Sequence, residues 1–230
     1  MPDLVPRNGR RPLPGRKTHD PQATRAALLA AGTELFAARG FDGVTVETLA
    51  RQAGVNKAMI SYHFGGKEGL YAATLKENFA GLAAEVTALS RSREPADAVL
   101  RAIVARLGAL MARQPNVPRM LLREVLGGGA RIDDHLVELL FSVYDAVRRV
   151  LARGAREGRL RSVDPLAAHL HLFGGLAFFF GTEHFRRQAV AAGRFPAGVR
   201  PPSPERFTRY VEELLARGLA SDAGVKSARR

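Results

Sequence analysis

Residues 45–64 read TVETLARQAGVNKAMISYHF, and the spacing of small and apolar residues in this stretch decides the fold of the amino-terminal part. A helix-turn-helix needs two short helices that cross at a steep angle through a turn of three or four residues. Ala50 offers the small side chain where the helices cross, Gly54 follows four positions later in the turn, and Ile60 is the apolar residue that faces back. This joint spacing predicts a helix-turn-helix, with an ordinary helical hairpin as the alternative.

Two further features of the same stretch agree with this prediction. Leu49 and Val55 complete a small apolar core between the two helices. Thr45 and Asn56 precede the first and the second helix, where a side-chain oxygen can accept a hydrogen bond from a free backbone N–H. We therefore expect one helix to begin after Thr45 and the next after Asn56.

The run Gly43–Tyr71, GVTVETLARQAGVNKAMISYHFGGKEGLY, closely resembles the DNA-binding region of the TetR family of transcriptional regulators. The resemblance covers residues 20–75 specifically. The matching elements are Gly40-Phe41, Thr45, Leu49-Ala50, Ala53-Gly54-Val55, Tyr62-His63-Phe64 and Lys67-Glu68-Gly69-Leu70. One position departs from the commonest family pattern, because Ser61 stands where tyrosine is usual and the aromatic Tyr62 comes one place later, about 100° further round the helix.

The resemblance implies an all-α fold of about nine helices. Residues 20–66 would form a three-helix DNA-binding domain with the helix-turn-helix, and residues 67–220 a larger helical bundle for effector binding and dimerisation. Almost every segment shows the helical period and none sustains the alternation of a strand, which favours the same fold class. Residues 1–19 and 221–230 are predicted to be a disordered basic arm and a disordered tail.

Side chains near the start of the second helix of the motif are the candidates for reading bases in the major groove. Lys57 suits guanine, Ser61 suits either kind of base, and Ala58 or Met59 suits a thymine methyl group. A plain phosphate contact or a solvated charge is the alternative for Lys57. The candidate DNA-contacting residues are Thr45, Asn56, Lys57, Ala58, Met59, Ser61, Tyr62 and Lys67.

Lys67 lies in the first turn of the following helix, where the helix dipole disfavours a cation. A phosphate at this position would reverse the sign of the interaction, since the ammonium and the helix N-terminus would then share one anion. Thr45 can add a hydroxyl or a backbone N–H to the same DNA strand. The alternative is an exposed lysine that Glu68 compensates.

The charge of the chain favours a polyanionic partner. Lys and Arg number 35 against 22 Asp and Glu, for a net charge of +13, although an arginine-rich coding habit is the alternative explanation. Residues 1–66 carry only +4 of this charge, so the motif is stronger evidence for DNA than the total charge. The basic arm can enter a minor groove or simply keep the chain in solution. Its cations are Arg7, Arg10, Arg11, Arg16 and Lys17.

The remaining chain shows helix start signals at Asp20-Pro21, Asp164-Pro165 and Ser203-Pro204. The period predicts helices over residues 95–113, 118–126, 133–158 and 164–188, then a loop and a last helix. The resemblance implies a homodimer formed chiefly by the last two long helices. Candidate interface residues are Leu166, Leu170, Gly174, Ala177, Phe178, Gly181, Phe207, Tyr210, Val211, Leu214 and Leu215. Burial of this stripe inside one subunit is the alternative.

The resemblance also implies a pocket for an unidentified small-molecule effector in the larger domain. When the effector binds, it would shift the spacing between the helix-turn-helix domains of the two subunits. The candidate lining residues are Met111, Met120, Arg123, Phe141, Tyr144, His169, Phe173 and Phe180. Ordinary core packing is the alternative for the apolar members of this set. The whole then predicts a homodimeric repressor that binds a palindromic operator and is released by its effector.

The sequence offers no catalytic or metal-binding pattern. There is no cysteine, which excludes disulfides, thiolate zinc sites and cysteine nucleophiles. His169 and His171 point about 200° apart on a helix and cannot share an ion, and Gly127–Gly129 lacks the Lys-Ser/Thr of a P-loop. We therefore expect neither an enzyme nor a cofactor. The longest apolar run, residues 172–181, is too short to span a membrane, so a cytoplasmic protein without a membrane partner is expected.

Two other classes of protein remain open at this stage. One is a helical ligand-binding or enzyme-like protein in which the hairpin is only structural. The other is an architectural protein that binds DNA without sequence preference. Salt-dependent binding to duplex DNA separates the first class from a regulator, and equal affinity for an operator and for random DNA would indicate the second.

Overall fold

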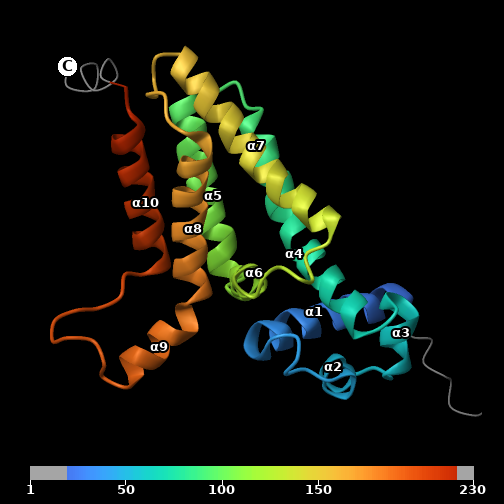
Figure 1. Ribbon diagram of the computed structural model, residues 1–230. Coiled ribbons are helices and arrows are strands. Elements are labelled where there is room, and N and C mark those ends of the chain that lie inside the picture. Colours follow the sequence, from blue (N-terminus) through green and yellow to red (C-terminus); the bar gives the residue numbers. More distant parts are fainter. Residues whose placement is uncertain (1–19, 222–230) are drawn as a thin grey trace, which may run out of the picture.

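The computed structural model describes residues 20–221, and this part of the chain contains ten α-helices and no strand (Figure 1). The predicted all-α fold is confirmed. In chain order the helices are α1 (Pro21–Arg39), α2 (Val46–Ala53), α3 (Ala58–Phe64), α4 (Lys67–Ser90), α5 (Ala96–Arg113), α6 (Asn116–Leu126), α7 (Asp134–Arg156), α8 (Pro165–Gly181), α9 (Glu183–Ala191) and α10 (Pro204–Leu219).

The predicted disordered arm, residues 1–19, lies outside the described residues, and so does the predicted tail apart from its first residue. Ser221 is described, and its backbone N–H donates a hydrogen bond to the carbonyl of Arg159 at 3.1 Å. An isolated antiparallel bridge joins Leu160 and Ala220 beside it. The end of α10 is therefore held against the α7–α8 connection.

Side-chain caps set the start of five of the helices. In each case an oxygen of Asp, Ser or Thr accepts a hydrogen bond from a backbone N–H of the first turn, which satisfies one of the free donors there. The capping residues are Asp20, Thr45, Asp133, Asp164 and Ser203. Proline follows the cap in α1, α8 and α10, where its fixed φ suits the first helical position. The three predicted helix starts of this kind are confirmed.

The helix expected over residues 164–188 is divided into α8 and α9 by a bend at Thr182, which corrects the predicted boundary. The Gly181 carbonyl accepts a hydrogen bond from Arg119 Nε of α6 at 3.4 Å. Gly181 also packs so tightly on α6 that a Cβ there would lie 2.8 Å from Leu122. The bend follows from this contact with α6. The periodicity of residues 164–188 alone could not predict the contact, because α6 lies elsewhere in the sequence. Within residues 20–221 no single helix meets the length and hydropathy of a membrane span, and only α8 and α9 together do, bent by 46°.

The ten helices form a small head and a longer body (Figure 1). Helices α1 and α3 pack against the start of α4, α2 packs on α1 and α3, and together these helices make the head. Helix α4 then runs into the body, where it packs along α7 and α5, while α10 lies on α5 and α8. Helix α6 contacts both α1 and α8, so it touches the head and the body together. One continuous apolar core joins the two parts.

Candidate nucleic-acid interface and its connection to the helical body

The turn between α2 and α3 has the backbone that the motif requires. Gly54 adopts φ 67° and ψ 29°, in the left-handed region that residues with a Cβ rarely enter. The backbone N–H of Val55 then donates to the Ala50 carbonyl at 3.0 Å and closes α2. No atom lies within 4 Å of a Cβ built on Gly54, so glycine is needed for the backbone conformation rather than for space. The predicted role of Gly54 is confirmed.

The small core of the motif is also present. Leu49, Ala50 and Ile60 are buried, while Val55 is half-buried and packs against them. The contact between α2 and α3 is thus made by the residues whose spacing predicted it. Since these side chains fix both helices on α1 and α4, the opposite surface of α3 is left open.

The N-cap position of α3 is Lys57, which makes no side-chain cap bond, and Asn56 just before it bonds the first residue of the helix. Asn56 Oδ1 accepts a hydrogen bond from the backbone N–H of Ala58 at 2.9 Å, as predicted. Asn56, Ala58 and Ser61 are exposed, and the Tyr62 side chain is 75% exposed, with its ring against the edge of His63. Met59 is half-buried and packs on the core, so it is the least accessible of the predicted base-reading side chains.

Lys57 and Glu47 form an exposed ion pair at 3.6 Å between the start of α3 and the start of α2. The pKa of the Glu47 carboxyl is lowered, first by a hydrogen bond with its own backbone N–H and to a smaller extent by the charge of Lys57. Exposed pairs of this length contribute little to stability. A DNA phosphate or a base edge can therefore take the place of Glu47 beside the ammonium at small cost.

Lys67 has a different environment from the predicted one. Its ammonium donates hydrogen bonds to the carbonyls of Phe41 at 3.2 Å and Val44 at 3.1 Å, and it lies 4.0 Å from the centre of the Phe41 ring. The acceptors of the Lys67 ammonium are thus backbone carbonyls of the α1–α2 loop. Thr45, by contrast, is exposed, and its hydroxyl caps α2 at 3.2 Å from the Thr48 nitrogen. The two carbonyls use two of the three ammonium donors, and a phosphate contact through the third stays a prediction.

A buried polar junction connects the head to α6. Glu124 is only 5% exposed, and its two carboxylate oxygens accept hydrogen bonds from the Tyr71 hydroxyl at 2.8 Å and the Arg131 backbone N–H at 2.9 Å. Burial, followed by the bond to Glu124, raises the pKa of the Tyr71 hydroxyl well above its ordinary value. The Arg131 guanidinium lies 4.1 Å from the Phe41 ring, which also contacts Tyr71 edge to face. Glu124 therefore ties α4, the α1–α2 loop and the α6–α7 connection together.

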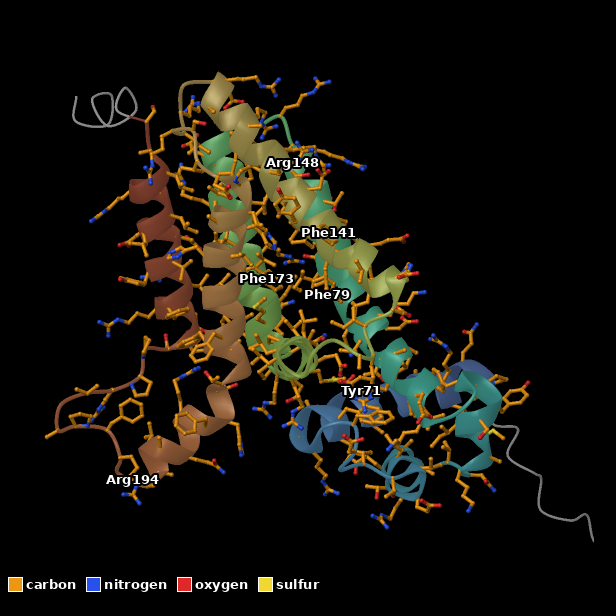
Figure 2. All side chains as sticks on the ribbon, in the orientation of Figure 1. Tyr71, Phe79, Phe141, Arg148, Phe173 and Arg194 are labelled. Carbon is orange, nitrogen blue, oxygen red and sulfur yellow. The ribbon has the colours of Figure 1, made fainter. Side chains whose placement is uncertain are left out.

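The body contains a cavity of about 270 Å³ between α4, α5, α6 and α8. Met111 and Phe173 of the predicted ligand-binding set line it, and Figure 2 shows Phe173 close to Phe79 in the middle of the body. Met120 lies in a small adjoining void, whereas Phe180 lines a separate cleft beside α9. Arg123 instead packs against Gly40 of the head. A Cβ built on Gly40 would lie 2.5 Å from Arg123 Nη1. The predicted set is therefore divided among several places.

Four of the predicted residues form an aromatic ladder that leads to the cavity. Ring centres lie 6.3 Å apart from Phe141 to Tyr144, 5.6 Å from Tyr144 to His169, and 5.7 Å from His169 to Phe173. Phe173 then meets Phe79 at 6.2 Å. The outer end, Phe141, is exposed on α7, and the inner end belongs to the cavity wall. The structure thus brings these side chains together without placing all of them on the cavity.

His169 in this ladder should make the fold sensitive to acid. Its Nδ1 is buried without a hydrogen-bond partner among the described residues, and burial lowers its pKa below the ordinary 6.5. The folded chain favours the neutral ring. The stability that depends on the neutral ring is therefore fully present above pH 6.5, and the free energy of unfolding declines as the pH falls from there through the lowered pKa. We expect His169→Phe to flatten the decline of the free energy of unfolding below pH 6.5, measured by urea denaturation. The exposed His171 provides the control, and an equal effect of His171→Phe would contradict this assignment.

The face predicted for dimerisation is only partly covered within the subunit. Ala177, Gly181, Val211 and Leu215 are buried, as the alternative of an internal stripe predicts. Five apolar side chains beside them remain open to solvent, between 44% and 66% exposed. They are Leu166, Leu170, Phe178, Tyr210 and Leu214. Two adjacent helices that expose this much apolar surface form a patch of the kind that marks a protein interface.

A helix-turn-helix with an open second helix, carried on a larger body with its own cavity, defines the molecule as a DNA-binding regulator. The model for bacterial regulatory proteins of the tetR family matches residues 28–74, and that for the tetracyclin repressor-like C-terminal domain matches residues 95–195. The chain belongs to the tetR family. It is a transcriptional regulator with a DNA-binding helix-turn-helix, and its relatives are regulators rather than enzymes.

Relatives and solved structures agree with this family. The chain is 30% identical to the HTH-type transcriptional regulator RutR of Escherichia coli strain K12 over 152 residues, which is 66% of this chain and 71% of RutR. It is 27% identical to the HTH-type transcriptional repressor NicS of Pseudomonas putida, over 89% of this chain and 96% of NicS. The FadR regulator from Bacillus subtilis, solved in complex with stearoyl-CoA, shares the fold with a TM-score of 0.66 at 20% identity, over 84% of this chain and 98% of FadR. PfmR from Thermus thermophilus also shares the fold, with a TM-score of 0.65 at 20% identity, over 83% of this chain and 97% of PfmR.

Proposed function

We propose that the chain is a homodimeric repressor that binds a palindromic operator through α3 and leaves it when a small molecule fills the cavity of the body. The observation that carries this proposal is the position of α6. One part of α6 lines the cavity through Val117, Pro118 and Leu121, and a later turn holds Glu124 in the junction with the head. A ligand that favours one position of α6 thereby favours one orientation of the reading head.

The dimer is supported by the open apolar face of α8 and α10. One helix-turn-helix reads too few base pairs for useful specificity, whereas a two-fold dimer reads two half-sites about one helical turn apart or a multiple of this distance. The repressor role is supported by the name of the relative NicS. Ligand binding in this fold is supported by the FadR structure, whose stearoyl-CoA is a property of that protein.

The first experiment measures binding to duplexes selected from random DNA at several salt concentrations. With about 6–10 phosphates contacted, the affinity should fall on the order of 10³–10⁵-fold between 50 and 200 mM salt, because bound counterions are released. Selected duplexes should bind at least about a thousandfold more tightly than random DNA. Equal affinity for both would favour the architectural class, and affinity that ignores salt would exclude DNA as the partner.

Lys57→Ala tests the direct reading of a base. The Lys57 side chain is exposed at the start of α3 and bonded only to Glu47 within the described chain. If it reads guanine, the substitution should relax the preference at one position of each half-site and weaken the selected duplex about tenfold. Selection from random DNA, repeated with the variant, measures this change. Lys76→Ala, an exposed lysine of α4 outside the motif, is the control. Equal weakening on every sequence would instead assign Lys57 to a phosphate.

A further inference from the structure

The wall of the cavity between α4, α5, α6 and α8 is mostly apolar, and its polar groups are almost all acceptors. Phe79, Leu82, Met111, Leu121 and Phe173 supply the apolar surface. The polar lining residues are Glu77, Asn78, Glu85 and Gln114. Within residues 20–221 no lysine, arginine or histidine lines this cavity. An anion that entered it would therefore meet no positive side chain on the wall.

Asn78 presents its oxygen as the free group. Its amide nitrogen donates to the Thr74 carbonyl at 2.7 Å and to the Thr33 hydroxyl at 2.8 Å. Because a carbonyl oxygen can only accept, the nitrogen of the amide must face Thr74. Both N–H donors are then used, and Asn78 Oδ1 has no partner in the described part of the chain. Asn78 as a residue is half-buried, and its oxygen is open to a ligand that brings an N–H or O–H donor.

The two carboxylates at the mouth of the cavity add to the acceptor character. Glu77 pairs with Arg25 at 2.7 Å, and Glu85 pairs with Arg106. The hydrogen bond from Arg106 holds the pKa of the Glu85 carboxyl below its ordinary value, so this group remains ionised at neutral pH. Both arginines stand outside the lining, and each carboxylate keeps further lone pairs for a donor. Gln114 is also a lining amide and has N–H donors of its own.

We propose that this cavity binds a compact apolar molecule that carries N–H donors and rejects molecules that carry a carboxylate. This inference rests on the proposed function for its regulatory consequence, since the same cavity would control α6. The apolar body of the ligand contacts Phe79 and Phe173, and its N–H group donates to Asn78 Oδ1. Glu85 lies about two helical turns further along α4 and acts on the ligand through its charge. A carboxylate in the same place would lose part of its water and meet the acceptor oxygen of Asn78, and no positive lining side chain of the described residues would replace that water, so its binding is disfavoured.

Three probes with the same apolar body test the proposal: 3-phenylpropylamine, 3-phenylpropanamide and 3-phenylpropanoate. Binding to the full chain is measured by isothermal titration calorimetry without DNA. We expect the amine or the amide to bind at least about tenfold more tightly than the carboxylate, which corresponds to one well-placed hydrogen bond or charge contact. The order of amine and amide tells whether the ligand needs a cation or only N–H groups. A carboxylate that binds equally well or better overturns the proposal, and so does the absence of binding by all three at about 5 mM.

Variants locate the binding in the cavity. Glu85→Gln should weaken the amine about fivefold or more and leave the amide almost unchanged, since only a charge is removed. Gln114→Arg introduces a cation and should raise the affinity for the carboxylate. Asp145→Asn is the control, because Asp145 of α7 pairs with Arg148 away from the cavity. Probe binding that responds to Asp145→Asn and not to the two cavity variants would overturn the assignment.

The outcomes for this inference and for the proposed function are distinguishable. Sequence-specific DNA binding without any preference for N–H probes would overturn the inference about the ligand and would leave the proposed regulator function intact. Preferential binding of the amine or the amide, together with DNA binding that ignores sequence, overturns the proposed regulator and leaves the ligand chemistry. Release of the selected duplex by the preferred probe supports both.

Discussion

Leu170→Asp should separate the two subunits of the proposed dimer, and operator binding should fall with it. Leu170 is 61% exposed at the middle of α8, so the subunit itself folds without its burial. In an isologous dimer each substitution occurs twice, and two carboxylates would then enter an apolar interface without a partner. We expect the dimer dissociation constant to rise at least about a hundredfold, from lost apolar burial together with buried charge.

Sedimentation equilibrium measures the dissociation constant, and fluorescence anisotropy with the selected duplex measures operator affinity. Leu126→Asp is the matched control, because Leu126 is a more exposed leucine at the end of α6, outside the face of α8 and α10. It should leave both quantities almost unchanged. A dimer that survives Leu170→Asp at micromolar concentration would place the interface elsewhere on the body.

Glu124→Ala should lower the free energy of unfolding by about 2–4 kcal/mol, although the residue lies far from the recognition surface. The substitution leaves the Tyr71 hydroxyl and the Arg131 backbone N–H without their acceptor in a buried place. Each unsatisfied buried donor costs about 1–3 kcal/mol. Because the Tyr71 bond joins the start of α4 to α6, we also expect the cavity ligand to lose part of its effect on operator binding.

Urea denaturation of the single variants and of the double variant measures the coupling. Tyr71→Phe removes only the hydroxyl, so the double variant with Glu124→Ala should be less destabilised than the sum of the two single changes. The control is Glu138→Ala, since Glu138 is an exposed carboxylate of α7 with only His135 nearby. Its effect should stay within about 0.5 kcal/mol. Additive effects of Tyr71 and Glu124 would show that the observed hydrogen bond carries no coupling.

The features that sequence reasoning predicted well are those that depend on neighbours along the chain. Gly54 in its left-handed conformation, the Asn56 cap and the buried Ile60 all act within about ten residues of one another. Short-range geometry then leaves few alternatives, because backbone sterics and capping are decided locally. The same reason explains why the starts of α1, α8 and α10 were predicted at Asp20, Asp164 and Ser203.

The predictions that needed correction depend on partners far away in the sequence. The bend at Thr182 comes from Gly181 against α6, about sixty residues earlier. The cavity wall includes Asn78, whose polar side chain between the apolar Leu75 and Phe79 was the available signal that sequence reasoning missed. No periodicity along one helix reports which other helix it will meet.

The amino-acid sequence by itself determined that the chain is helical and that residues 45–64 form a helix-turn-helix. It could do so because turn, cap and apolar spacing are properties of one short segment. Only the tertiary structure decided that α6 touches both cavity and head, that Glu124 is the buried link, and that no cationic side chain of residues 20–221 lines the cavity. These properties arise where helices distant in the chain pack together, and packing depends on the shapes of both surfaces.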